Sequence, residues 1–263
     1  MQLEKRAEII KDWIYTAANH LKENMASQMT VEEKSNRKDL VTNLDKETEM
    51  FFREQIEHHF PGEGILGEEH MGETITSLDG PVWIIDPIDG TANFVLQHNH
   101  FAIMIAYFED GVGQIGFVYD VMADTMLEAI KDNGVKINGQ SYTLPFRDKP
   151  ISDGLIAINS SLLLDNTYHM QEMVQEAMGL RLYGSAGLEL ISVVKGETLG
   201  YTSPHLQPWD IAAGSVAINE LGLCLTQMSG EPIDFMNPNP VFVGYPSVYK
   251  RFRKQYETYK TMN

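Results

Sequence analysis

The chain has 263 residues, 43% of them apolar and 10% aromatic, which is enough to bury a globular core in one large domain or two modest ones. Its 20 Lys and Arg against 37 Asp and Glu give a formal net charge of −17, and no basic stretch could neutralise a run of nucleic-acid phosphates. Composition therefore argues against a nucleic-acid polymer as a partner.

Cysteine content and hydropathy narrow the class of protein further. Cys224 is the only cysteine, so neither an intramolecular disulfide nor a cysteine-rich zinc site can form within the chain. The first residues are charged and helix-like, and no apolar run reaches the roughly 18 residues of a membrane-spanning helix. We expect a soluble, cytoplasmic protein that does not bind a membrane.

The first half of the chain combines helices with an antiparallel sheet. Apolar residues at helical spacing predict helices over residues 3–21 and 45–59. The polar segment between them, residues 30–43, predicts a mobile loop of the kind that can cover a site. From 101 to 142, short apolar runs alternate with turn signals, which predicts an antiparallel meander.

The second half alternates strands and helices. Strands are predicted at residues 155–159, near 182, and at 198–201, 223–226 and 241–243; helices are predicted at 164–178, 188–194, 211–221 and from 247. The fold class is therefore mixed α+β and α/β. We predict an N-terminal α+β half, residues 1–148, and a C-terminal α/β half, residues 149–263.

An apolar strand near residue 82 ends in a group of polar residues. Asp86 and Asp89 flank a proline whose fixed φ lets both carboxylates and the carbonyl of Ile88 face one side. Hard oxygen ligands of this kind suit Mg²⁺. If Gly90 and Thr91 begin a helix, their N–H groups can hold a phosphate oxygen. Asp-Gly is also a common turn pair, so an ordinary turn remains the alternative.

Three further acids have structural as well as functional explanations. Thr42 to Asp45 fits a capping box at the start of the second helix, and Asp210, which precedes an apolar helical run, fits an N-cap. Glu68 lies among turn residues, where an acid is usually solvated. Capping and metal binding are compatible if different carboxylate oxygens serve each role.

One glycine pattern is a decoy. Gly111, Gly113 and Gly116 fit the dinucleotide-binding pattern Gly-x-Gly-x-x-Gly. A strand-like run follows them, so the pattern lies in a predicted hairpin, and the helix N-terminus that would hold a pyrophosphate is missing.

Two strings in the chain resemble the signatures of a known family. Asp-Pro-Ile-Asp-Gly-Thr-Ala-Asn-Phe at residues 86–94 is similar to a signature of the inositol monophosphatase family, and Pro-Trp-Asp-Ile-Ala-Ala-Gly at 208–214 is similar to its C-terminal signature. Residues 39–45 and 67–69 match as well, so the resemblance covers most of the chain. It implies a layered αβαβα fold and, commonly, a homodimer.

The resemblance also implies a set of metal ligands. By match to the family, Glu68, Asp86 and the carbonyl of Ile88 bind a first Mg²⁺. Asp86, Asp89 and Asp210 bind a second, and Glu68 helps to hold a third through water. The cofactor expected on this basis is two to three Mg²⁺ ions.

The same match assigns catalytic and phosphate-binding roles. Thr91 would orient the attacking water through its hydroxyl, which Asp45 positions, and with Glu68 these form the expected catalytic set. Gly90 and Thr91 would contact the phosphate. Lys34 aligns with a lysine of the family's mobile metal loop, although a lysine in a charged run is usually solvated.

The substrate pocket departs from the family pattern. Ser185 and Ala186 match a segment that contacts substrate, and Asp89 is expected to contact it too. Inositol-preferring members carry a glutamate seven residues before the aspartate of the Trp-Asp pair, and this chain has Ser203 there. We expect Ser203 to line the pocket, and its short, uncharged side chain leaves substrate preference open.

These observations predict Mg²⁺-dependent hydrolysis of a small-molecule phosphate monoester by a metal-activated water, with lithium inhibition as in the family. Inositol monophosphate is the first expected substrate. The alternatives with the same chemistry are the 2′-phosphate of NADP, fructose 1,6-bisphosphate and a 3′-phosphoadenosine nucleotide. A non-catalytic phosphate-binding regulatory protein is the alternative of another class.

Overall fold

The computed structural model describes residues 2–33, 40–72 and 75–262. Its α-helices are α1 (Leu3–Asn24), α2 (Asn43–His59), α3 (Thr91–Gln97), α4 (Ser160–Leu164), α5 (Met170–Glu176), α6 (Ala186–Val194), α7 (Pro208–Glu220) and α8 (Pro246–Met262), with short 3₁₀ helices η1 (Ile151–Asp153) and η2 (Thr167–His169). Its strands are β1 (Val31–Glu33), β2 (Leu40–Thr42), β3 (Gly64–Gly67), β4 (Pro81–Asp89), β5 (Ala102–Glu109), β6 (Val112–Asp120), β7 (Thr125–Ile130), β8 (Gly134–Ile137), β9 (Gln140–Tyr142), β10 (Leu155–Ile158), β11 (Gly179–Arg181), β12 (Gly200–Leu206), β13 (Cys224–Gln227) and β14 (Asn239–Gly244).

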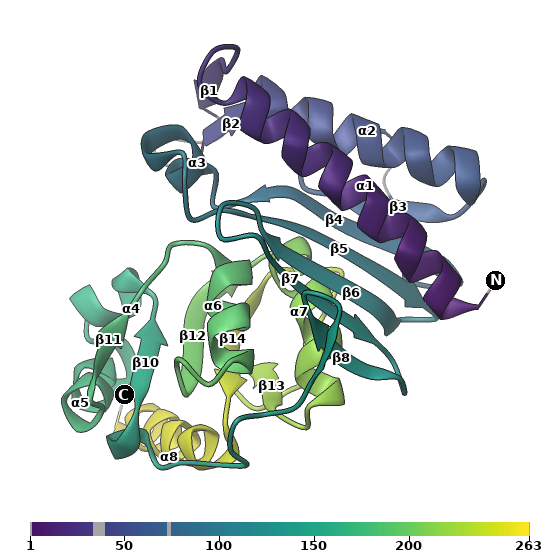
Figure 1. Ribbon diagram of the computed structural model, residues 1–263. Coiled ribbons are helices and arrows are strands. Elements are labelled where there is room, and N and C mark those ends of the chain that lie inside the picture. The colour runs from purple at the N-terminus through teal and green to yellow at the C-terminus, as the bar shows by residue number, and fades with distance from the viewer. Residues whose placement is uncertain (1, 34–39, 73–74, 263) are drawn as a thin grey trace.

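Two sheets alternate with layers of helices, which confirms the predicted αβαβα fold (Figure 1). Helices α1 and α2 cover the outer face of a seven-stranded sheet, and α6 and α7 lie between it and a five-stranded sheet. Helices α4, α5 and α8 pack on the far side of the five-stranded sheet. Each sheet is thereby buried on both faces, as its apolar strands require.

The seven-stranded sheet has the order β3-β4-β5-β6-β7-β8-β9. From β4 to β9 every neighbouring pair is antiparallel, which confirms the predicted meander, and only β3 runs parallel to its neighbour β4. The decoy glycines lie in the β5–β6 hairpin as predicted. A Cβ at Gly116 would overlap the carbonyl oxygen of Ala213, so this glycine lets α7 pack closely on the sheet.

The five-stranded sheet has the order β11-β10-β12-β14-β13, with β10 parallel to both of its neighbours. The single helix predicted over 164–178 is wrong. Helix α4 ends at Leu164, and α5 begins only at Met170, because Asn166, Tyr168 and His169 adopt left-handed backbone angles between them. Such angles break a helix.

The predicted loop over residues 30–43 contains regular structure at both ends. Strands β1 and β2 pair antiparallel, with Val31 opposite Thr42. Residues 34–39 between them, which include Lys34, lie outside the described residues.

The apolar core forms two clusters, one on each face of the seven-stranded sheet. The cluster beneath α1 and α2 includes Trp13, Phe52 and Trp83, and the other runs through α6 and α7 to the five-stranded sheet.

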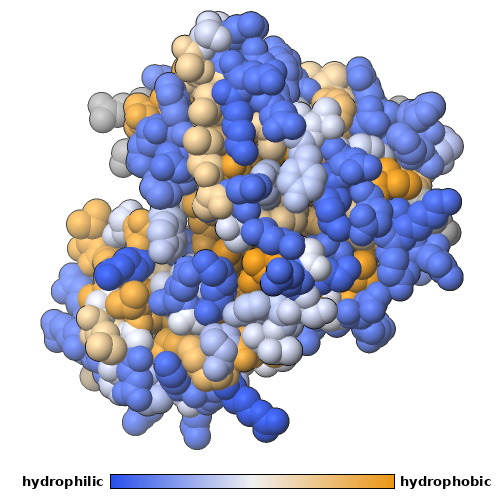
Figure 2. All heavy atoms as spheres, in the orientation of Figure 1, coloured by the Kyte–Doolittle hydropathy of each residue, from blue (hydrophilic) through white to orange (hydrophobic). Residues whose placement is uncertain are grey.

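The division of the chain into two halves at residues 148 and 149, which falls between β9 and β10, stays a prediction. The face in Figure 2 is mainly hydrophilic, with apolar residues in small groups. None of the described helices has the length and apolar character needed to span a bilayer.

Candidate active site

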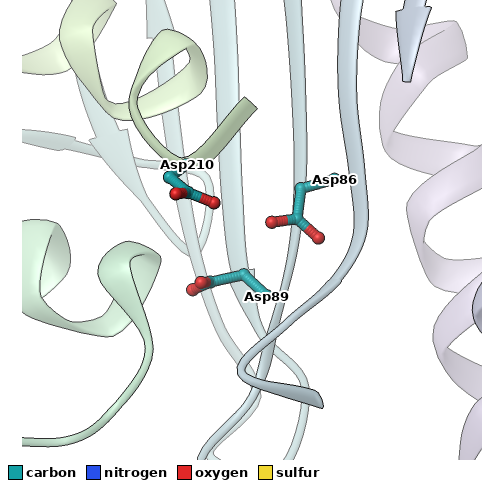
Figure 3. A group of neighbouring side chains, drawn as sticks. All are labelled: Asp86, Asp89 and Asp210. Atoms are coloured by element: carbon teal, nitrogen blue, oxygen red, sulfur yellow. The ribbon is translucent and has the colours of Figure 1, made fainter. Parts of the chain in front are cut away.

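The acidic end of β4 is shaped by an irregularity in the strand. Asp86 pairs with Met104 and Asp89 with Ala102, and the register shifts between the two pairs. In a regular strand, residues three apart point to opposite faces. The shift removes this alternation, so both carboxylates point to the same side, toward α7 (Figure 3).

Asp210 completes the acidic cluster from a different layer. It lies in the first turn of α7, and its Oδ2 accepts the N–H of Gln207 at 2.8 Å. The N-cap is Gln207, so the expectation that Asp210 is the N-cap is wrong, although it belongs to the capping box. Ligand oxygens of Asp86, Asp89 and Asp210 all lie within 4.8 Å of one another (Figure 3).

The start of α6 fixes the orientation of Asp89. The backbone N–H of Ala186 donates to Oδ1 at 3.0 Å, and that of Gly187 donates to Oδ2 at 2.7 Å. The Ser185 hydroxyl also donates to Oδ2. The structure therefore places Ser185 and Ala186 against a carboxylate of the site, and both are buried.

Burial and repulsion make these acids hard to ionise without a counter-charge. Burial raises the pKa of Asp86 well above its ordinary 3.8, and repulsion from Glu68 and Asp89 raises it further. Burial raises the pKa of Asp89 to about 6, although hydrogen bonds from Ser185 and Gly187 lower it. A cation would supply the missing charge.

The acids open onto a cavity of about 220 Å³. It is lined by Leu40, Glu68, Asp86, Ile88, Asp89, Gly90, Thr91, Ala92, Gly184 and Asp210. This described lining has four carboxylates and no Lys or Arg, and its donor atoms are the hard oxygens that Mg²⁺ prefers. The residues present therefore fit a divalent cation.

Gly90 and Thr91 lie where the strand passes into a helix. Gly90 is the N-cap of α3, with a φ of 91°, a left-handed value that favours glycine. The turn and the helix start proposed as alternatives are thus one feature. It brings the Thr91 hydroxyl to the cavity beside Asp89.

Asp45 uses its two oxygens for two partners. Its Oδ2 accepts the N–H of Thr42 at 2.9 Å and the Thr42 hydroxyl, which confirms the predicted capping box of α2. Its Oδ1 accepts the hydroxyl of Thr91 at 3.2 Å. The structural explanation and the arrangement implied by the resemblance therefore coexist.

Ser203 does not reach the cavity. The residue is 1% exposed, and on β12 it pairs with Val241 of the neighbouring strand β14. It is not among the residues that line the cavity. An inward position on a buried strand could not be read from the sequence, because the register was unknown. Its role as a substrate contact stays a prediction.

Glu189 is a buried acid that the sequence interpretation missed. Its Oε1 accepts the N–H of Tyr183 at 2.6 Å, and burial raises its pKa to about 7. It thereby closes the turn that carries Ser185 to Asp89. The available signal was a single acid within the apolar run of residues 188–194.

By fold and site, the chain is a phosphatase of the layered αβαβα class. Its fold matches the crystal structure of an IMPase/NADP phosphatase complexed with Mg²⁺ and phosphate, at a TM-score of 0.89 and 30% identity, over 96% of this chain and 95% of that one. The Mg²⁺ and phosphate belong to that structure, and the acids gathered here suit a divalent cation such as Mg²⁺.

Sequence comparison names the family. Residues 2–260 match the inositol monophosphatase family. The chain is 44% identical over 253 residues to inositol-1-monophosphatase of Bacillus subtilis strain 168, covering 95% of each protein. It is 31% identical over 212 residues to fructose-1,6-bisphosphatase/inositol-1-monophosphatase of Thermotoga maritima, covering 81% of this chain and 80% of that protein. The chain belongs to the inositol monophosphatase family and is a hydrolase of that family.

Proposed function

We propose that the protein hydrolyses inositol monophosphate with the aid of two to three Mg²⁺ ions. The observation that carries the proposal is the convergence of Asp86, Asp89 and Asp210 within 4.8 Å at a cavity whose described lining residues include no Lys or Arg. Glu68, Asp86 and the Ile88 carbonyl would hold one ion, and the three clustered aspartates another. When bound, Mg²⁺ neutralises phosphate charge and lowers the pKa of water.

The side chains of the site prepare a water for attack. The Thr91 hydroxyl lies 3.2 Å from Asp45 Oδ1 and 3.1 Å from the carbonyl oxygen of Ile88. Its single proton can be donated to only one of them at a time, and its lone pairs remain to accept a hydrogen from water. Donation to Asp45 increases the electron density on the hydroxyl oxygen, so Thr91 and Asp45 together would orient and polarise that water.

The phosphate ester would lie with its phosphate toward Gly90 and Thr91. The N–H groups at the start of α3 point away from the helix and have no partners within it. The carboxylates would repel a phosphate dianion without metal, so substrate binding should depend on Mg²⁺. Glu68 is within Coulombic range of Asp86 and belongs to this charge balance.

Two relatives support two further candidate substrates. The Thermotoga maritima relative is named for fructose 1,6-bisphosphate as well as inositol phosphate, and the matched structure for NADP. In this chain a buried serine, Ser203, occupies the place where inositol-preferring members carry an acid. The same site could therefore also hydrolyse fructose 1,6-bisphosphate or the 2′-phosphate of NADP.

A phosphate-release screen tests the proposal. Inositol 1-phosphate, fructose 1,6-bisphosphate, NADP and 3′-phosphoadenosine 5′-phosphate are compared with Mg²⁺, with EDTA, and with Mg²⁺ plus Li⁺. Release should be fastest from inositol 1-phosphate, should stop in EDTA and should fall with Li⁺. If no ester is hydrolysed, the enzymatic proposal is wrong and the phosphate-binding alternative gains support.

The variant Asp86→Asn tests the metal assignment. Removing the charge of the acid expected to bridge two ions should lower kcat by at least about 10²-fold, because metal polarisation is worth several kcal/mol. Glu57→Gln, an exposed acid on α2, is the control and should retain wild-type turnover. Full activity in Asp86→Asn would overturn the assignment.

The homodimer and the cytoplasmic location stay predictions.

A further inference from the structure

Another buried carboxylate, on α2, lies outside the cavity. Glu49 on α2 is 0% exposed. Its Oε2 accepts the backbone N–H of Glu69 at 2.6 Å, and its Oε1 accepts that of Met71 at 3.0 Å and the Nε of Arg53 at 2.9 Å. Burying a carboxylate costs several kcal/mol unless partners offset it, and these three hydrogen bonds, one of them from a guanidinium, do so.

The backbone donors to Glu49 belong to the segment that carries Glu68. The N–H of Glu68 itself donates to the carbonyl of Ile85 at 3.2 Å, and the next N–H, that of Glu69, donates to Glu49. Both peptide groups that flank the Glu68 Cα are therefore anchored, one to β4 and one to α2. Because Ile85 precedes Asp86, the first anchor brings Glu68 beside the acidic cluster.

The packing around Glu49 leaves little freedom. A Cβ at Gly67 would overlap the Glu49 carboxyl group, so that group occupies the space of a side chain on β3. Gly67 pairs with Ile85 in the parallel β3–β4 register. The carboxylate thus packs directly on the end of β3, from which Glu68 emerges.

This anchoring opposes a specific force. Glu68 and Asp86 lie within Coulombic range, so their carboxylates repel each other whenever both are ionised. Hydrogen bonds from Glu69 and Met71 to a buried carboxylate hold the turn in place.

We propose that Glu49 is a positioning residue for the metal site: it holds the turn after β3 so that Glu68 faces Asp86 before Mg²⁺ binds. The inference rests on the proposed function, because it takes Glu68 as a metal ligand. Glu49 itself does not line the cavity. It acts on metal affinity through Glu68.

Mg²⁺ titration calorimetry of the whole protein tests the inference with Glu49→Gln. The amide has the shape of the carboxylate but offers only one acceptor oxygen, so at least one backbone N–H loses its partner. Residues that orient a ligand typically contribute about 10- to 100-fold to metal affinity, and we expect a loss in that range. Activity should recover as Mg²⁺ is raised, with the KM for inositol 1-phosphate little changed. The control Glu57→Gln should bind Mg²⁺ as the wild type does.

A double-mutant cycle separates positioning from general stability. If Glu49 acts through Glu68, the double variant Glu49→Gln/Glu68→Gln should bind Mg²⁺ no more weakly than Glu68→Gln alone. A further loss in the double variant, or wild-type affinity in a folded Glu49→Gln, overturns the inference and leaves the proposed function standing. A wild-type protein that binds no Mg²⁺ overturns both.

Gly67→Ala provides a second route if Glu49→Gln does not fold. The added Cβ would displace the Glu49 carboxyl group while leaving its charge and that of Glu68 in place. Circular dichroism should show native helix content, and calorimetry should show the same kind of loss in Mg²⁺ affinity. A folded Gly67→Ala with wild-type affinity overturns the inference.

Discussion

Asp89 shows how one side chain is prepared for a ligand that carries opposite charge. Both of its oxygens are oriented by groups at the start of α6, namely Ser185, Ala186 and Gly187. These bonds favour the ionised form, but burial outweighs them and raises the pKa to about 6. The protein thus orients the Asp89 carboxylate before a ligand binds. A bound cation would supply the positive charge that stabilises its ionised form.

The pKa of Asp89 predicts that the stabilisation by Mg²⁺ grows as pH rises. Its pKa is about 6 in the fold against an ordinary 3.8, so the folded state holds the proton more tightly. In EDTA, the contribution of this group to stability is full below the ordinary value and is lost as pH rises through about 6. Mg²⁺ competes with that proton, so the gain in Tm from Mg²⁺ should grow over the same range.

Thermal unfolding in EDTA and in Mg²⁺, between about pH 5 and pH 8, checks this prediction. The Tm difference between the two series should widen as pH rises through about 6. In Asp89→Asn the widening should shrink, because the titrating group is gone. A Tm difference that is constant with pH in the wild type would contradict the expected competition.

At the scale of elements, the start of α2 joins folding and function. Thr42 caps the helix and holds one oxygen of Asp45, while the other oxygen of Asp45 accepts the Thr91 hydroxyl on α3. The capping box was readable because it involves residues three apart in sequence. Its link to Thr91 required a contact across 46 residues, which only the family resemblance implied.

Thr42→Ala should therefore affect stability and turnover together. Loss of an N-cap side chain costs about 1 kcal/mol, and Asp45, without the Thr42 hydroxyl, should orient Thr91 less well and lower kcat. Thr42→Ser keeps the hydroxyl and should restore both quantities. Urea unfolding and phosphate release measure them. Reduced stability with unchanged kcat would show that Asp45 keeps its orientation without the cap.

Elements were predictable where local patterns decide them. The helices α1 and α2 and the β5–β9 meander follow from apolar periodicity and turn residues. The break between α4 and α5 did not follow, because Asn166, Tyr168 and His169 take left-handed angles inside an apolar pattern that reads as one helix. Apolar periodicity shows which face of a segment is buried, but it does not show where a helix is interrupted.

At the scale of the whole molecule, residues from several layers of the fold make up the candidate site. Residues within the two signature strings could be found from the sequence because they lie at fixed spacings within recognisable motifs. Glu49 could not, because its backbone partners, Glu69 and Met71, lie 20 and 22 residues away along the chain. Glu189, whose partner Tyr183 is only six residues away, left one signal, an acid within an apolar run. The burial of Ser203 depends on strand register, which a single sequence leaves open.

The clustered acids come from different layers of the fold, so we predict that bound Mg²⁺ links those layers. Asp86 and Asp89 come from β4 in the seven-stranded sheet, and Asp210 comes from α7 between the sheets. An ion bound to all three should restrain the first turn of α7 against β4. At about 100 times its Kd, a ligand that binds only the folded state adds about 2.7 kcal/mol of stability.

Hydrogen exchange with mass spectrometry can locate that restraint. Mg²⁺ should slow amide exchange in residues 208–214 and at the end of β4, and should have little effect on α8, which lies on the far side of the five-stranded sheet. In Asp210→Asn the slowing in 208–214 should disappear, while the turn at Glu68 keeps part of its protection, because Glu68 and Asp86 still offer oxygens to an ion. Equal slowing of 208–214 in the wild type and in Asp210→Asn would mean that the ion does not bind α7. The acidic cluster would then be a site of β4 and its neighbouring turn alone.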